Sequence, residues 1–205
     1  EFEFFGAAGP QLREERIEAN VQSDELSVVG VAEIGRALPM FLRAMKNLKR
    51  AADRERPDAV ILVDFPDFNL KLAKAMKKQG FTVIYYISPQ LWAWRKYRVS
   101  TIKKYVDLLI TILPFEKAWY AKRGVKHVEY VGHLLANEVR ARRSKAEFCH
   151  ESGLNDSKPI IALLPGSRSK EIERILPVML ETASEIAVTN PEVQFVVPLV
   201  SRKNQ

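Results

Sequence analysis

Short apolar segments alternate with helix-forming segments along this chain, and that alternation limits the folds open to it. The apolar segments are rich in β-branched and aromatic residues and end at polar or turn-forming residues, which predicts strands at 59–63, 82–87, 108–113 and 127–131. The segments between them predict helices at 70–78, 95–104 and 115–123. Strands joined through helices run parallel in one sheet, so we predict an α/β fold with a doubly wound, Rossmann-like parallel sheet.

A polar, charged stretch at 137–158 predicts no strand and separates two parts of the chain. Before it, 2–5 predicts an aromatic strand that leads into a turn of small residues. After it, one more strand–helix–strand unit is predicted, with its elements at 159–164, 169–187 and 193–200. Pro177 predicts a bend or a restart within that helix, because proline lacks the N–H that a helix interior uses.

These segments predict two lobes. We assign 1–136 to a first Rossmann-like lobe, 137–158 to a connection and 159–205 to the beginning of a second Rossmann-like lobe. The sequence begins without Met, and a single strand–helix–strand unit cannot bury its own sheet faces. We therefore expect both lobes to continue in residues that are absent from this sequence.

The second lobe opens on a strand that leads into Pro-Gly-Ser-Arg and then into a helix. The first turn of a helix leaves backbone N–H groups unpaired and partly positive, and such a turn binds phosphate. Gly166 permits close approach to the backbone, Ser167 offers a hydroxyl and Arg168 a planar fork of donors. The motif predicts either an anion site or an ordinary strand-to-helix turn with a solvated arginine.

The predicted strand 59–63 ends in Asp64-Phe65-Pro66-Asp67-Phe68-Asn69. Ligands of open α/β sheets bind at the carboxyl ends of the strands, so Asp64 lies at the expected edge and is our candidate general base. Asp67 or Asn69 has a structural role open to it, because either can cap the helix that follows. Two carboxylates without further ligands are weak evidence for a metal.

The segments after two other strands reach the same predicted edge. Trp92 and Trp94 stand in the loop that follows 82–87, where large rings cover a ligand, lie at a lipid interface or pack into the core; we expect at least one of them to pack. Gln90 lies beside them, and His133 follows 127–131, where it either touches a ligand or bonds within its loop.

The segment 26–52 combines an apolar face with basic side chains. Its apolar residues include Val28, Val29, Leu38, Phe41 and Leu42. This pattern is typical both of an amphipathic helix packed on a sheet and of a segment that lies on anionic lipid. Pro39 predicts the start of a helix or a kink.

The composition narrows the partners. Lys and Arg outnumber Asp and Glu by 32 to 25, a net charge of +7, which favours anionic partners; no known nucleic-acid module is present, so nucleic acid ranks last. One cysteine and three histidines without ligand spacing make neither an internal disulfide nor a metal site. No run approaches the roughly 20 apolar residues of a membrane span, and no signal peptide is recognisable, so we expect a cytoplasmic protein.

Seven blocks of this sequence, in order, resemble the lipid-A-disaccharide synthase family. They are FFGAAGPQL at 4–12, LSVVGVAEI at 26–34, VDFPDFNLKLAK at 63–74, YYISPQLWAWR at 85–95, ILPFEKAWY at 112–120, VGHLLA at 131–136 and LLPGSRSKEI at 163–172. The resemblance implies the two-lobed GT-B fold of glycosyltransferases, with the acceptor and membrane side at 1–136 and the start of the UDP-sugar lobe at 159–205. The family's opening Gly-Glu-x-Ser-Gly-Asp block and most of its donor lobe have no counterpart here, and Leu134 stands where the family often has proline. We therefore expect a polypeptide of this length to be inactive by itself.

The resemblance also implies an activity and its partners. The enzyme would transfer 2,3-diacylglucosamine from its UDP derivative to 2,3-diacylglucosamine 1-phosphate, with inversion, releasing UDP and forming the β-1,6 disaccharide of lipid A in Gram-negative lipopolysaccharide synthesis. Acylated substrates favour the interpretation of 26–52 as a segment that lies on anionic lipid. The implied location is therefore the cytoplasmic face of the inner membrane, with its anionic surface as a partner. A homodimer is a further partner that we consider, and no cofactor is implied.

Site roles follow residue by residue from the resemblance. Asp64 matches the aspartate that takes the proton from the acceptor hydroxyl, and Arg168 matches the arginine beside the departing diphosphate. Gly166, Ser167 and Glu171 belong to the donor phosphate side, whereas the acceptor or lipid side takes Asp67, Asn69, Gln90, Trp92, Trp94 and His133. No metal is needed if Arg168 and the helix N-terminus neutralise the phosphates. The alternatives are another GT-B transferase or epimerase acting on a soluble UDP-sugar, and a non-catalytic peripheral membrane module.

Overall fold

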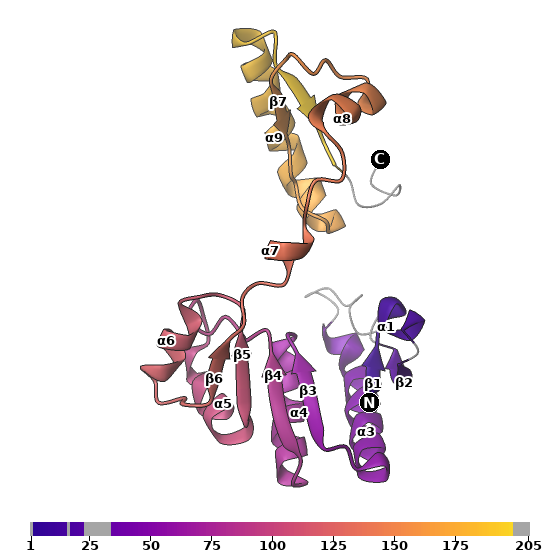
Figure 1. Cartoon of the computed structure of the whole chain (residues 1–205), viewed down its shortest axis with the longest axis vertical. Helices are drawn as coiled ribbons and strands as arrows, with labels where there is room; N and C mark the ends of the chain where they lie inside the picture. The colour runs from indigo at the N-terminus through magenta and orange to yellow at the C-terminus, as the bar shows by residue number, and fades with distance from the viewer. Residues whose placement is uncertain (1, 16, 23–33, 199–205) are drawn as a thin grey trace. The chain divides into compact units, whose positions relative to one another are not determined.

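The computed structural model describes residues 2–15, 17–22 and 34–198 (Figure 1). They form two compact units, Glu1–Glu138 and Val139–Gln205. Val28 and Val29, two of the residues predicted to face a membrane, lie outside the described residues.

The first unit is built on a parallel sheet whose strands lie in the order β3-β4-β5-β6. These strands are β3 (Ala59–Val63), β4 (Thr82–Tyr86), β5 (Leu108–Thr111) and β6 (Val128–Tyr130). A separate parallel pair, β1 (Phe5–Ala8) and β2 (Glu18–Gln22), lies beside them in Figure 1. Because β3 to β6 all run parallel, their four carboxyl ends lie at one edge of the sheet.

Helices connect the strands of this unit. They are α1 (Pro10–Glu14), α3 (Ile34–Glu55), α4 (Pro66–Lys78), the 3₁₀ turn η2 (Lys96–Arg98), α5 (Val99–Tyr105), α6 (Glu116–Ala121) and α7 (Leu135–Glu138). The apolar residues of α4 recur at helical spacing, so that Leu72, Ala73 and Met76 form one buried face.

The core of the first unit lies between the sheet and these helices. Val83, Tyr85 and Leu109 are fully buried in the central strands, and Ile102 of α5 and Tyr120 of α6 are fully buried against them. Each large apolar side chain removed from water in this way stabilises the fold by about 1.5–3 kcal/mol. This core holds the carboxyl edge of the sheet as a rigid platform.

The second unit is a short βαβ structure. Its elements are α8 (Lys145–Ser152), β7 (Ile160–Ala162), α9 (Ser169–Thr189) and β8 (Gln194–Val196), and β7 pairs with β8 in parallel. The helix α8 begins with a capping box, in which Ser144 and Glu147 bond each other's backbone N–H groups. The Gln194 amide binds both the N–H and the C=O of Asn155, at 2.8 and 2.7 Å, and so ties β8 to the segment after α8.

The fold class predicted from the sequence is confirmed, because the described strands pair in parallel and alternate with helices. Several predicted boundaries are wrong. The first strand is Phe5–Ala8, so it includes the small residues assigned to a turn and excludes 2–4. The helix predicted at 70–78 begins four residues earlier at Pro66, because proline is well suited to the first helical position.

Two prolines lie inside longer helices and neither starts one there. The helix α3 begins at Ile34 and continues through Pro39, and α9 is a single helix that does not restart at Pro177. The stretch predicted as a connection contains no strand, as expected, but it does contain α8. The Ser-x-x-Glu pattern of Ser144 and Glu147 is the sequence signal for the start of this helix.

Candidate active site

Asp64 lies on a strained turn between β3 and α4. Asp64 and Phe65 both have φ of 46°, in the left-handed region that non-glycine residues rarely adopt. Two such residues in succession cost on the order of 1–3 kcal/mol each, and a fold keeps them only where surrounding contacts determine the conformation. The turn therefore holds Asp64 at the carboxyl edge at an energetic cost.

Four hydrogen bonds hold this turn. The Asp64 N–H donates to the Tyr86 carbonyl at 3.0 Å, which extends the β3–β4 pairing by one residue. The Asn69 amide donates to the carbonyls of Val63 and Asp64 at 3.0 and 2.8 Å. The Tyr85 hydroxyl donates to the Asp64 carbonyl at 2.6 Å. The backbone of Asp64 is thereby fixed from one strand, β4, and one helix, α4.

Tyr85 remains a neutral donor in this arrangement. Burial raises the pKa of its phenol far above the ordinary value, and the nearby Asp64 carboxylate raises that pKa further. The side chain is fully buried, so the hydroxyl has a fixed position beneath the turn. This role is not visible in the sequence, because Tyr85 lies in an ordinary apolar strand.

The Asp64 side chain itself is exposed. Within the described part of the chain, its carboxylate makes no hydrogen bond and no ion pair, whereas the Asp67 carboxylate three residues later makes two. A base needs a free lone pair directed at the proton that it removes. Of the two carboxylates after β3, Asp64 is therefore the one free to act on a ligand.

Asp67 and Asn69 do not cap α4, which corrects the prediction. The residue before the helix is Phe65, without a side-chain cap. Asn69 bonds backward to the turn, and Asp67 Oδ1 accepts from Arg95 Nη1 at 2.6 Å and from Arg98 Nη2. Burial raises the pKa of Asp67, but the two guanidiniums outweigh it and hold that pKa below its ordinary value.

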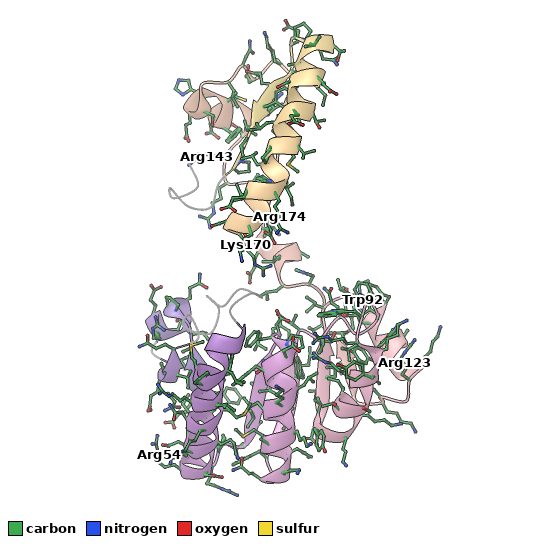
Figure 2. All side chains as sticks on the ribbon, turned by 180° about the vertical axis from the view of Figure 1, so that it is seen from behind. Arg54, Trp92, Arg123, Arg143, Lys170 and Arg174 are labelled. Atoms are coloured by element: carbon green, nitrogen blue, oxygen red, sulfur yellow. The ribbon has the colours of Figure 1, made fainter. Side chains whose placement is uncertain are left out.

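The loop between β4 and η2 places its two tryptophans differently. Trp92 is half-buried, and its Nε1–H donates to the Glu116 carboxylate at 3.1 Å. Trp94 is 55% exposed and stacks under the Arg95 guanidinium at 4.2 Å. Trp92 packs edge-on against Phe115, with 5.1 Å between ring centroids, but it stays half-buried outside the core cluster, so the expectation that one ring enters the core is met only in part. Figure 2 shows Trp92 at the opposite end of the first unit from Arg54.

Two buried polar side chains support this loop. Glu116 is 1% exposed and accepts both the Trp92 N–H and the Leu113 N–H, while the fully buried Tyr120 donates to the Pro89 carbonyl at 2.6 Å. Burial raises the pKa of Tyr120, and Glu116 adds to that shift, so the phenol stays protonated. Gln90 is exposed on the same loop.

His133 has a local role. Its Nδ1 accepts the Leu135 N–H at 3.2 Å, at the start of α7. The loop bond that the sequence left open as one alternative is therefore present, and the side chain remains exposed.

The helix α3 divides its apolar residues between the core and solvent. The Phe41 ring contacts Phe65 and Phe68, at 5.9 and 6.0 Å between ring centroids, so this residue packs beside the Asp64 turn. Leu38 and Leu42 are 53% and 62% exposed. Of the predicted membrane-facing residues that the structure describes, only these two present their side chains mainly to solvent.

In the second unit, the backbone of the Pro-Gly-Ser-Arg turn already bonds a carboxylate side chain of the protein itself, that of Glu171. Glu171 Oε2 accepts the N–H groups of Ser167 and Arg168, both at 3.3 Å. Gly166 has φ of 106°, and a Cβ there would lie 2.6 Å from that same carboxylate oxygen. The Arg168 side chain is 84% exposed, with one contact of 3.3 Å to Glu171.

No three His, Cys, Asp or Glu side chains come together as a metal-binding group anywhere in residues 2–15, 17–22 and 34–198. Over the same residues, no helix combines the length and apolar character that crossing a membrane requires.

The fold is similar to that of GT-B-like α/β proteins whose structures have been solved. The structure of S. aureus MnaA with UDP aligns with 100% of this chain and with 64% of the MnaA chain, at a TM-score of 0.60 and 12% sequence identity. The UDP-GlcNAc 2-epimerase from Neisseria meningitidis, solved with UDP-GlcNAc bound, aligns with 94% of this chain and with 55% of the epimerase chain, at a TM-score of 0.56 and 15% sequence identity. At this identity the likeness shows the GT-B-like fold alone.

The family model described as lipid-A-disaccharide synthetase matches residues 1–205, and this chain belongs to that family. Curated relatives named lipid-A-disaccharide synthase include those of Nitrosococcus oceani, 44% identical over 97% of this chain, and Geobacter sulfurreducens, 41% identical over 97%. The family membership that the seven sequence blocks predicted is confirmed. The chain spans about half of the length of these relatives, 51% in both.

Proposed function

We propose that a full-length protein carrying this sequence is the glycosyltransferase that joins two acylated glucosamines in lipid A synthesis. Its donor is UDP-2,3-diacylglucosamine, and its acceptor is 2,3-diacylglucosamine 1-phosphate. The observation that carries this proposal is the family match along the whole chain. The free Asp64 carboxylate at the carboxyl edge of a UDP-sugar type of fold supports it with a mechanism.

In that mechanism, Asp64 takes the proton from the acceptor 6-hydroxyl as its oxygen attacks C1 of the donor sugar. The bond between C1 and the diphosphate oxygen breaks, and UDP departs with the electron pair. Attack from the face opposite the leaving group inverts C1, which gives the β-1,6 linkage. The rigid turn around Asp64 favours this step because the base is positioned before substrate binds.

Charge develops on the departing diphosphate. Arg168 has its guanidinium exposed and offers a fork of donors that fits two phosphate oxygens. The N–H groups of Ser167 and Arg168 are held by Glu171 in this conformation, so a diphosphate bound to them would displace that carboxylate. Arg168 is therefore the residue of this turn on which the donor role chiefly rests.

Acylated substrates also require access to lipid. Leu38 and Leu42 are exposed on α3, together with Arg43, Lys46 and Arg50. Apolar side chains flanked by cations support docking on the anionic cytoplasmic face of the inner membrane. Association as a homodimer stays a prediction.

The experiment is to supply the full-length protein with the acylated donor and acceptor and to identify products by mass spectrometry. The proposal expects UDP and an acylated disaccharide 1-phosphate. Turnover of UDP-GlcNAc alone, without need of acyl chains, would favour a transferase or epimerase acting on a soluble sugar. Vesicle binding without any UDP release would favour a non-catalytic membrane module.

A further inference from the structure

Two arginines in the first unit converge on a single oxygen. Arg95 Nη1 and Arg98 Nη2 both bond Oδ1 of Asp67, and neither bonds Oδ2. Two cations around one carboxylate leave one positive charge over. The guanidiniums also repel each other, so a second anion beside them would be stabilising.

The pair is held in place before any ligand binds. The Arg98 side chain is only 15% exposed, and that of Arg95 is 35% exposed and stacked on Trp94 at 4.2 Å. Arg95 also has φ of 54°, in the left-handed region, which the fold maintains at an energetic cost. A bridge that only fastened the loop to α4 would need one arginine and no strained residue.

The pair lies close to the candidate base. Asp67 is in the first turn of α4, three residues after Asp64. Tyr85 is close enough to sense both groups: its hydroxyl bonds the Asp64 carbonyl, and besides burial its pKa is raised by Asp64 and lowered by Arg98. A sugar whose hydroxyl reaches Asp64 can therefore place a second substituent near the guanidiniums.

We propose that Arg95 and Arg98 bind the 1-phosphate of the acceptor sugar and so select a phosphorylated acceptor. This inference rests on the proposed function. A phosphate monoester carries a charge of about −2. Its several oxygens can accept hydrogen bonds from the N–H forks of two arginines at once. Asp67 holds the two guanidiniums apart and aligned, and the phosphate takes their remaining N–H donors. Neither arginine was among the site residues predicted from the sequence.

The test compares two acceptors, 2,3-diacylglucosamine with and without its 1-phosphate, in non-ionic detergent free of phospholipid, so that no lipid phosphate competes. In the full-length protein, Arg95→Gln and Arg98→Gln should each lower kcat/KM about tenfold to a hundredfold for the phosphorylated acceptor and leave the other acceptor unchanged. Arg98 is mostly buried, so Arg95→Gln keeps the test valid if Arg98→Gln does not fold.

The matched control is Arg123→Gln. Arg123, which Figure 2 labels, also stacks on a tryptophan, with its guanidinium 3.8 Å from the centre of the Trp119 ring. This variant should leave the preference for the phosphorylated acceptor unchanged. Equal losses for both acceptors in the arginine variants would mean that the pair only fastens the loop, and would overturn the inference.

A failure of the proposed function gives a different result, namely no UDP release from wild-type protein with either acceptor. In that event, isothermal titration with glucosamine 1-phosphate and with glucosamine still tests the pair. Tighter binding of the phosphorylated sugar that is lost in Arg95→Gln would support a phosphate site. Equal binding of both sugars, or no effect of the substitution, would refute it.

Discussion

At the scale of single residues, the site depends on side chains that fix a backbone as much as on those that meet a ligand. Tyr85 and Asn69 donate three hydrogen bonds to backbone carbonyls of the turn. Because these bonds hold the Asp64 backbone, the Asp64 carboxylate itself stays free. Asp64 and Asp67 differ in one respect that their shared sequence block does not reveal: Asp67 is neutralised by arginines, and Asp64 is not.

Tyr85→Phe tests the support of the turn. The substitution removes one hydroxyl and leaves the buried ring in place, so the free energy of unfolding should fall by about 1 kcal/mol. Urea denaturation of this chain, followed by the fluorescence of Trp92, Trp94 and Trp119, measures it. In the full-length protein kcat should fall more than KM rises, because the base is less well positioned. Unchanged stability and kcat would show that the Tyr85 bond does not support the turn.

Arg168→Ala tests the donor side. If Arg168 stabilises charge on the departing diphosphate, kcat of the full-length protein should fall about 10²- to 10³-fold. Arg174→Ala is the matched control on the same helix, α9, where Figure 2 labels Arg174. Equal kinetics for wild type and Arg168→Ala would mean that the Arg168 charge is merely solvated.

At the scale of elements, the sequence predicted strands better than helix ends and turns. Runs such as 59–63 are recognisable as strands because they are continuously apolar and rich in β-branched residues, although the structure leaves Ile61 and Val63 of β3 52% and 49% exposed rather than buried on both faces. The left-handed turn at Asp64 and Phe65 carries a much weaker signal, since aspartate is only enriched in that region and phenylalanine is a true exception there. The Arg95–Asp67–Arg98 cluster joins residues about 30 positions apart in sequence, as the separations of 28 and 31 show, so only the fold reveals it.

The contact between α4 and the sheet makes a prediction about pH. The Asp107 carboxylate accepts hydrogen bonds from the Lys77 ammonium of α4 at 2.5 Å and from the Val83 N–H of β4 at 2.8 Å. It thereby ties α4 to β4. Burial raises the pKa of Asp107, but these two donors outweigh it and hold the pKa below its ordinary value. A lowered folded-state pKa means that the stabilisation is complete above the unfolded value of about 3.9 and is lost as pH falls through the folded value.

Asp107→Asn should therefore lower the free energy of unfolding by about 1 kcal/mol at pH 7, mostly through the Val83 bond, because solvent screens the half-exposed Lys77 pair. The difference from wild type should shrink as pH falls below about 4. Urea denaturation at a series of pH values measures both. A difference that stayed constant across that range would contradict the assignment to the Asp107 charge.

At the scale of the whole molecule, the family and fold class followed from the sequence, because seven blocks in order and a repeated strand–helix alternation carry them. The candidate site is only partly predictable: Asp64 was predicted from its place after a strand and Asn69 from the same sequence block, whereas the hydrogen bonds from Tyr85 and Asn69 that support the turn needed the structure. The basic composition, +7 overall, is consistent with the two proposed anionic partners, a lipid surface and phosphorylated substrates.

Membrane association makes its own prediction. Leu42→Glu places a charge on the exposed face of α3 and should weaken binding of the full-length protein to anionic vesicles severalfold in a sedimentation assay. Val188→Glu on α9, where the side chain is 84% exposed, is the control and should have no effect. Equal binding of both variants and wild type would exclude α3 from the membrane surface.

The most direct test of the central claim is the rate of acceptor-dependent UDP release by the Asp64→Asn variant of the full-length protein. Asparagine keeps the shape of the side chain and tolerates the left-handed conformation, so the fold should survive while the base is lost. The rate should fall at least about 10²-fold, with the thermal melting temperature unchanged. Wild-type turnover in a folded Asp64→Asn protein would contradict the assignment of Asp64 as the base.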